Sequence, residues 1–99
     1  MAGYQTKKAG SVESAFYKVL ATPTAIQELG EEKLTKLSEV LVGMLREAAT
    51  VDWQKREPVR ARLRNLIRAM MRRYGYPTDN QDRVVDSVLR QTAKFFPGT

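Results

Sequence analysis

Hydrophobic residues recur at intervals of three and four along most of the chain, which is the spacing of one face of an α-helix. The first such segment covers residues 11–21 and ends before Pro23, because a residue that precedes proline is pushed out of helical geometry. Thr22 can cap a second helix of about two turns, and Gly30 can end that helix in a left-handed conformation. The pattern therefore predicts two short helices before residue 31.

The longest apolar repeat begins directly after Gly30 and predicts a third helix that frays near Thr50. A turn is expected at Asp52, a residue type that often caps the helix that follows it. The positions that should face the core of this helix are Leu34, Leu37, Leu41, Met44, Leu45 and Ala48. No segment of the chain alternates between apolar and polar residues with the period of two that is typical of strands.

A fourth helix is predicted over residues 57–74, since Pro58 is tolerated only in a first helical turn. Gly75 can terminate this helix, and Tyr76 can fold back onto its last turn. The apolar face of the helix consists of Val59, Leu63, Leu66, Ile67, Met70, Met71 and Tyr74. This face should build much of the core.

A capping box at Thr78 and Gln81 predicts a fifth helix that reaches Phe95. We therefore expect an all-α fold, a small bundle of about five helices that forms a single domain over residues 11–99. Residues 1–10 contain little that could enter a core, and we interpret them as a flexible arm or a remnant of cloning.

The positive charge is concentrated in one quarter of the chain. Residues 51–76 hold eight basic and two acidic residues, whereas the other 73 residues hold nine of each, so the whole net charge of +6 arises in this quarter. A local concentration of charge attracts partners more strongly than the same charge spread over the surface. We therefore expect an anionic partner for this segment.

The arginines of the fourth helix form the candidate binding face. Winding the helix at about 100° per residue places Arg64, Arg68 and Arg72 in one row opposite the apolar face. Arg60 and Arg73 flank the two edges of the apolar face. The planar guanidinium suits a bidentate grip on phosphates or carboxylates. An alternative interpretation is equally plausible at this point: a solvated face whose arginines pair with acidic residues of neighbouring helices.

Other residues carry weaker hypotheses. Trp53 could stack on a partner, but an aromatic residue at a helix junction is more often a core residue with its indole hydrogen-bonded. Asp79, Asp82 and Asp86 share a helix face and could bind a hard metal ion. Charge stabilisation of the helix explains them better, including a pairing of Asp86 with Arg90 four residues later. We therefore predict no metal site.

Composition argues against catalysis. The chain has no cysteine and no histidine, and it has no glycine-rich phosphate loop, nuclease carboxylate cluster or serine elbow. It also has no apolar run of membrane-spanning length and no signal-peptide pattern, so we expect a cytoplasmic protein that contacts no membrane. We expect the chain to be a binding module and not an enzyme.

Two runs of residues carry a specific resemblance: VDWQKREPVRARLR at residues 51–64 and RYGYP at residues 73–77. They resemble the C-terminal segment of the R subunits of type I restriction enzymes, and the resemblance extends over residues 14–94. It departs from the family pattern at Pro58, where alanine or serine is expected. R subunits are large ATP-dependent translocases and endonucleases that cleave DNA.

The resemblance implies a helical module without catalytic residues. Its expected role is to dock the motor subunit onto the methyltransferase and specificity subunits, and direct contact of the arginine face with the backbone of duplex DNA is the alternative. No cofactor is expected in this part, because ATP and magnesium would be bound by other parts of the parent subunit. The expected contact residues are Arg60, Arg64, Arg68, Arg72 and Arg73, with Trp53 as a possible partner contact.

Overall fold

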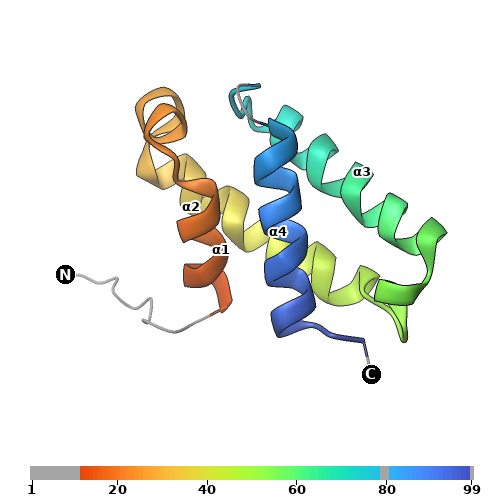
Figure 1. The fold of residues 1–99 in the computed structure, drawn as a ribbon. Coiled ribbons are helices and arrows are strands. Elements are labelled where there is room, and N and C mark those ends of the chain that lie inside the picture. The colour runs from red at the N-terminus through yellow and green to blue at the C-terminus, as the bar shows by residue number, and fades with distance from the viewer. Residues whose placement is uncertain (1–11, 79–80, 99) are drawn as a thin grey trace.

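The computed structural model describes residues 12–78 and 81–98, and these ranges form an assembly of helices (Figure 1). They contain four α-helices and one short 3₁₀ helix: α1 (Val12–Leu20), α2 (Pro23–Ala48), η2 (Trp53–Lys55), α3 (Glu57–Arg73) and α4 (Gln81–Phe95). No strand is present in the described ranges, so the predicted all-α class is confirmed. The predicted N-terminal arm, residues 1–10, lies outside them.

The expected number of about five helices is corrected to four. The predicted second and third helices form one element, α2, which bends at Gly30. Gly30 has a positive φ of 84° and a ψ of 161°, a conformation that is essentially restricted to glycine. The helix resumes at the next residue, so no loop separates the two parts. The predicted cap is confirmed, because the Ala25 amide donates to the Thr22 hydroxyl oxygen at 3.1 Å.

The helices surround one core. In Figure 1, α4 lies between α1 and α3 and packs against both, while the long α2 also packs against both α1 and α3. Most residues of the predicted apolar faces point inward. Met44 does not belong to the core, and Leu66 is only partly buried. The buried hydrophobic residues are Phe16, Leu20, Ala25, Leu34, Leu37, Leu41, Val42, Leu45, Trp53, Leu63, Ile67, Met71, Tyr76, Val84, Val85 and Val88.

An aromatic cluster joins α1 to the end of α4. The Phe16 ring lies 6.2 Å from the Phe95 ring and 6.4 Å from the Phe96 ring, measured between centroids. The guanidinium carbon of Arg46 lies 5.5 Å from the centre of the Phe96 ring, a distance at which a cation is attracted to the ring face. The cluster therefore ties α1, α2 and the C-terminal segment together.

The N-terminal end of α3 is fixed by a contact that we call the tryptophan clasp: η2 bound to the segment 96–98. The Trp53 indole N–H donates to the Phe96 carbonyl at 2.7 Å, and the Gln54 side-chain amide donates to the Pro97 carbonyl at 3.0 Å. The Asp52 amide donates to the Gly98 carbonyl at 2.7 Å. This clasp connects two parts of the chain that are about forty residues apart in sequence.

The expected turn at Asp52 is present, with one correction. Asp52 has a left-handed backbone, with φ 59°, but its side chain makes no capping hydrogen bond to η2. The long helix ends at Ala48, close to the fraying expected near Thr50, and α3 begins at Glu57 as predicted. Pro58 therefore lies in the first turn of α3, where its missing amide hydrogen costs no helical hydrogen bond.

The C-terminal end of α3 is fixed by a second contact, the tyrosine clasp. Gly75 has a φ of 73°, and the amides of Gly75 and Tyr76 donate back to the carbonyls of Arg72 (3.0 Å) and Met71 (2.8 Å). This is the predicted glycine-terminated ending. The Tyr76 hydroxyl then donates to the Leu20 carbonyl at the end of α1, at 2.6 Å. Burial raises the pKa of Tyr76.

In the described part of the chain no helix is both long and apolar enough to span a membrane.

Candidate functional site: the two sides of α3

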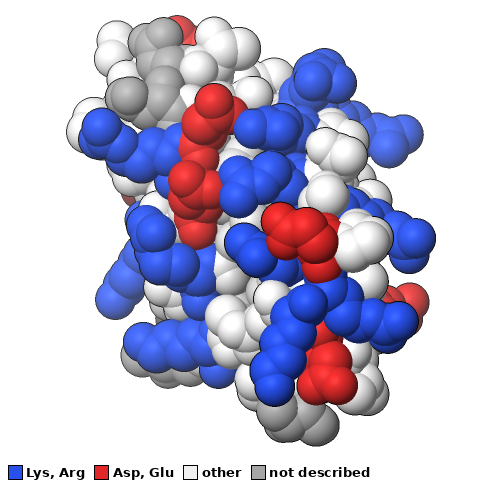
Figure 2. All heavy atoms as spheres, turned by 45° about the vertical axis from the view of Figure 1, so that its right-hand side comes forward, with Lys and Arg blue, Asp and Glu red and all other residues white. Residues whose placement is uncertain are grey.

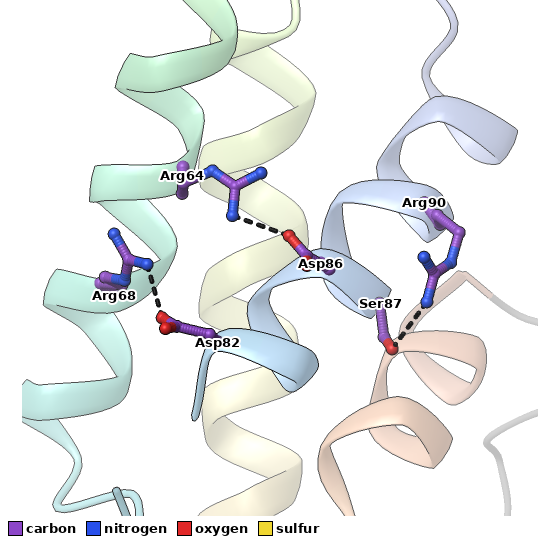
Figure 3. Close-up of polar contacts among 6 residues, drawn as sticks. All are labelled: Arg64, Arg68, Asp82, Asp86, Ser87 and Arg90. Atoms are coloured by element: carbon purple, nitrogen blue, oxygen red, sulfur yellow. Dashed lines mark hydrogen bonds and ion pairs between the residues drawn. The ribbon is translucent and has the colours of Figure 1, made fainter. Parts of the chain in front are cut away.

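The row formed by Arg64, Arg68 and Arg72 is divided by the structure. Arg64 pairs with Asp86 at 2.7 Å and Arg68 pairs with Asp82 at 2.6 Å, both across the contact between α3 and α4 (Figure 3). Arg72 is exposed and has no ion pair within the described residues. The expectation that the whole row lies opposite the apolar face is therefore wrong for Arg64 and Arg68.

Helical geometry explains the division. Residues four apart are separated by about 400°, so a row with this spacing drifts by about 40° around the helix at each step. The row thus starts beside α4 at Arg64 and ends on the solvent side at Arg72. The side chains of Arg64 and Arg68 are only 34% and 31% exposed, because α4 covers part of them.

Both ion pairs remain open to water at the aspartate. The Asp82 side chain is 81% exposed and the Asp86 side chain is 48% exposed. Pairs of this kind contribute about 0.2–1 kcal/mol each to stability, since water screens them. The pairs therefore occupy Arg64 and Arg68 and add only a little to the stability of the contact between α3 and α4.

The described residues include two of the three aspartates considered as a metal site, Asp82 and Asp86. The predicted pairing of Asp86 with Arg90 is wrong. Asp86 is bound by Arg64, and Arg90 instead donates to the Ser87 hydroxyl at 3.4 Å (Figure 3). Asp79 lies outside the described ranges. Within those ranges no group of three or more histidine, cysteine or carboxylate residues could hold a metal ion.

The other predicted contact residues differ in how accessible they are. Arg60 is exposed and lies 3.3 Å from Glu57 on its own helix. Arg73 is exposed and, like Arg72, has no ion pair within the described part of the chain. Arg62, which was not among the predicted contacts, is also exposed and has no ion pair there. Trp53 is only 2% exposed and belongs to the tryptophan clasp. Its indole is therefore a core group in this structure, which matches the alternative interpretation given above.

Sequence reasoning missed a shallow hollow on the solvent side of α3. The hollow has a volume of about 530 Å³. Its lining consists of Pro58, Ala61, Arg62, Asn65, Leu66 and Ala69, and we call this surface the outer face of α3. The sequence signal that could have predicted this hollow is the pair of small residues, Ala61 and Ala69, on the side of the helix away from the core. The face is framed by charge, since Arg62 lies near one end and Arg72 and Arg73 follow Ala69 by one turn.

A second hollow, of about 300 Å³, lies between α1 and α2 and is acidic. Its lining includes Glu13, Glu31 and Glu39 together with the Tyr17 ring. Burial raises the pKa of Tyr17, and the charge of Glu31 raises it further. The molecule therefore carries acidic groups on its α1–α2 side and most of its basic groups on its α3–α4 side.

Figure 2 shows the α3–α4 side as a mixed surface. Basic side chains are abundant there, but acidic side chains lie among them, and uncharged patches separate several basic groups. This mixture agrees with the two aspartates of α4 that pair with α3. The segment that is so basic in sequence is therefore not one continuous positive ridge in space.

Comparisons with known proteins place the chain in a family. Residues 8–97 match the family model described as "Type I restriction enzyme HindI endonuclease subunit-like, C-terminal". Over 80 residues the chain is 41% identical to the type I restriction enzyme HindI endonuclease subunit of Haemophilus influenzae. That alignment covers 80% of this chain but only 8% of the relative. No solved structure matches the chain significantly.

Proposed function

Because this chain belongs to the family of C-terminal domains of HindI-like type I restriction endonuclease subunits, we propose that it is a non-catalytic docking module. In this proposal it attaches the motor subunit of a type I restriction enzyme to the methyltransferase and specificity subunits. The chain corresponds to a small C-terminal part of a much larger relative, and it has a hydrophobic core of its own.

The observation that carries the proposal is the difference between the two sides of α3. On the side of α4, Arg64 and Arg68 are bound by aspartates of the same chain. On the outer face, a hollow of about 530 Å³ is framed by arginines that have no acidic partner among the described residues. Contact with another protein subunit would supply acidic groups to these arginines and would cover the hollow.

Binding to the methyltransferase complex of the same restriction system tests the proposal. The purified chain is mixed with that complex and analysed by gel filtration at low and at high salt. We expect co-elution that weakens with salt, because exposed charge pairs contribute to it. The complete endonuclease subunit serves as the positive control. Absence of co-elution at both salt concentrations, while the complete subunit binds, would contradict a docking role.

Direct contact with the backbone of duplex DNA is a second candidate. The observation in its favour is that Arg62, Arg72 and Arg73 remain exposed and unpaired within the described residues. Three phosphate contacts would give a salt slope, d log K/d log [salt], of about −3. Because Arg64 and Arg68 are neutralised, we expect any DNA binding to be weaker than the sequence of α3 implies.

The DNA candidate is tested by titrating a labelled duplex at several salt concentrations. Replacing Arg62, Arg72 and Arg73 together by glutamate should abolish the salt-dependent binding if these residues carry it. If the triple variant binds DNA with unchanged affinity and salt slope, the DNA role of α3 is wrong.

A further inference from the structure

The outer face of α3 has the features of a site for another helix. Leu66 is half-buried and forms the apolar part of the hollow, and Ala61, Asn65 and Ala69 line it with short side chains. Short side chains allow a second helix to approach within the usual distance of about 8–10 Å between axes. Within the described part of the chain, no other helix covers this face.

Arginines lie before and after the stretch of the face formed by Asn65, Leu66 and Ala69. Arg62 is three residues before Asn65, and Arg72 and Arg73 are three and four residues after Ala69, so helical spacing places all of them beside the hollow. Arg62 and Arg73 are eleven residues apart, which corresponds to about 16 Å along the helix axis. An occupant must therefore offer negative charge at two places about three turns apart.

The molecule itself shows what kind of occupant pairs with α3. On the opposite side, α4 presents Asp82 and Asp86, four residues apart, to Arg68 and Arg64, which are also four residues apart (Figure 3). Carboxylates on a neighbouring helix thus reach guanidinium groups of α3 at 2.6–2.7 Å. The same chemistry suits the outer face, where the arginines still lack carboxylates within the described residues.

We propose that the outer face of α3 receives an acidic amphipathic helix of a partner subunit. This inference rests on the docking function proposed above and names the surface that performs it. Small or apolar residues of the partner helix pack over Leu66 and Ala69, and its carboxylates bind Arg62 before them and Arg72 or Arg73 after them. The pairing is bidentate where the guanidinium fork meets a carboxylate.

An acidic helix fits this face better than duplex DNA does. The lining residues between Arg62 and Arg72 are uncharged and consist of Asn65, Leu66 and Ala69. A phosphate backbone would leave this uncharged part without a partner, and it would use only the arginines before and after it. A helix with an apolar face covers both kinds of surface at once.

Two variants of the outer face test the proposal in the intact chain. The first, R62E/R73E, reverses the charge before and after Leu66 and Ala69, and the second, A69W, fills the hollow at an exposed helical position. The matched control is R83E/K94E, which makes the same change in net charge at two exposed residues of α4. The probe is the methyltransferase complex of the same restriction system, and thermal unfolding verifies that every variant is folded.

We expect R62E/R73E and A69W each to raise the Kd for the complex at least about tenfold, while R83E/K94E changes it less than about threefold. Equal effects of the two charge reversals, or no effect of A69W, would overturn the assignment of the surface and leave the docking function intact. Failure of the unaltered chain to bind the complex would overturn both. If R62E/R73E weakens only the binding of duplex DNA, the face binds nucleic acid and the proposal is wrong.

Discussion

The side of α3 that faces α4 and the side that faces solvent carry the same residue type in different surroundings. Arg64 and Arg68 are largely covered and bound by carboxylates of α4, whereas Arg62, Arg72 and Arg73 are exposed and lack ion pairs within the described residues. The difference teaches that the arginines of one helix cannot be counted together as a binding surface. Only those without an internal partner are available to another molecule.

The largest difference between the two sides should appear in stability. Ile67 is completely buried, so Ile67→Ala should lower the free energy of unfolding by about 2–5 kcal/mol through lost burial and the cavity that remains. Asn65→Ala, on the outer face of the same helix, should change it by less than about 0.5 kcal/mol. Urea unfolding of both variants measures this. Similar losses for the two would show that the outer face is structural after all.

The tryptophan clasp at the start of α3 should have the next largest effect. Trp53→Phe keeps an aromatic ring but removes the indole donor from the Phe96 carbonyl, and we expect a loss of about 1–3 kcal/mol. Gln54→Ala removes the more exposed bond to Pro97 and should cost less. Thermal unfolding of the two variants ranks them. If the two losses of stability are equal, the hydrogen bond of Trp53 stabilises the start of α3 no more than the exposed bond of Gln54 does.

The tyrosine clasp at the other end of α3 should respond to pH. Tyr76→Phe removes the bond to the Leu20 carbonyl and should cost about 1 kcal/mol at neutral pH. Because burial raises the pKa of Tyr76 in the folded state, its contribution is complete below the ordinary tyrosine pKa of 10.0 and is lost as the pH rises through the raised value.

The stability difference between the unaltered chain and Tyr76→Phe should therefore narrow above pH 10, the ordinary tyrosine pKa. Unfolding curves recorded at neutral and at alkaline pH measure this difference. A gap that stays constant over the whole range would mean that the Tyr76 hydroxyl is not held in its protonated form by the fold.

The smallest effects should come from the ion pairs between α3 and α4. A double-mutant cycle of Arg64→Ala and Asp86→Ala should give a coupling energy of about 0.2–1 kcal/mol, which decreases in high salt. Arg62→Ala combined with Asp86→Ala is the control, since these residues lie on different sides of α3, and it should give no coupling. A coupling in the control of the same size would remove the distinction between the two sides.

Local features of the fold were predictable from the sequence, whereas contacts between distant residues were not. Thr22, Pro58 and Gly75 marked helix ends correctly, because capping and termination depend on residues within one turn. Gly30 was recognised as a break, and the helix that follows it was expected to begin at the next residue, as it does.

The candidate site was predictable only in part. The arginines of α3 were evident, but the partners of Arg64 and Arg68 lie 22 and 14 residues away, and their pairing depends on how α4 packs. The partner of Trp53 lies 43 residues away for the same reason. The hollow depends on which short side chains remain uncovered after the helices have packed.

The most direct test of the account uses the absence of cysteine from the chain. A single cysteine is introduced on the outer face as Ala69→Cys or on α1 as Lys18→Cys, and its alkylation rate is measured with and without the methyltransferase complex. When about nine tenths of the chain is bound, we predict alkylation about tenfold slower at position 69 and nearly unchanged at position 18. Slowing at position 18 alone, or at neither position under binding conditions, would contradict the assignment of the outer face of α3 as the docking surface.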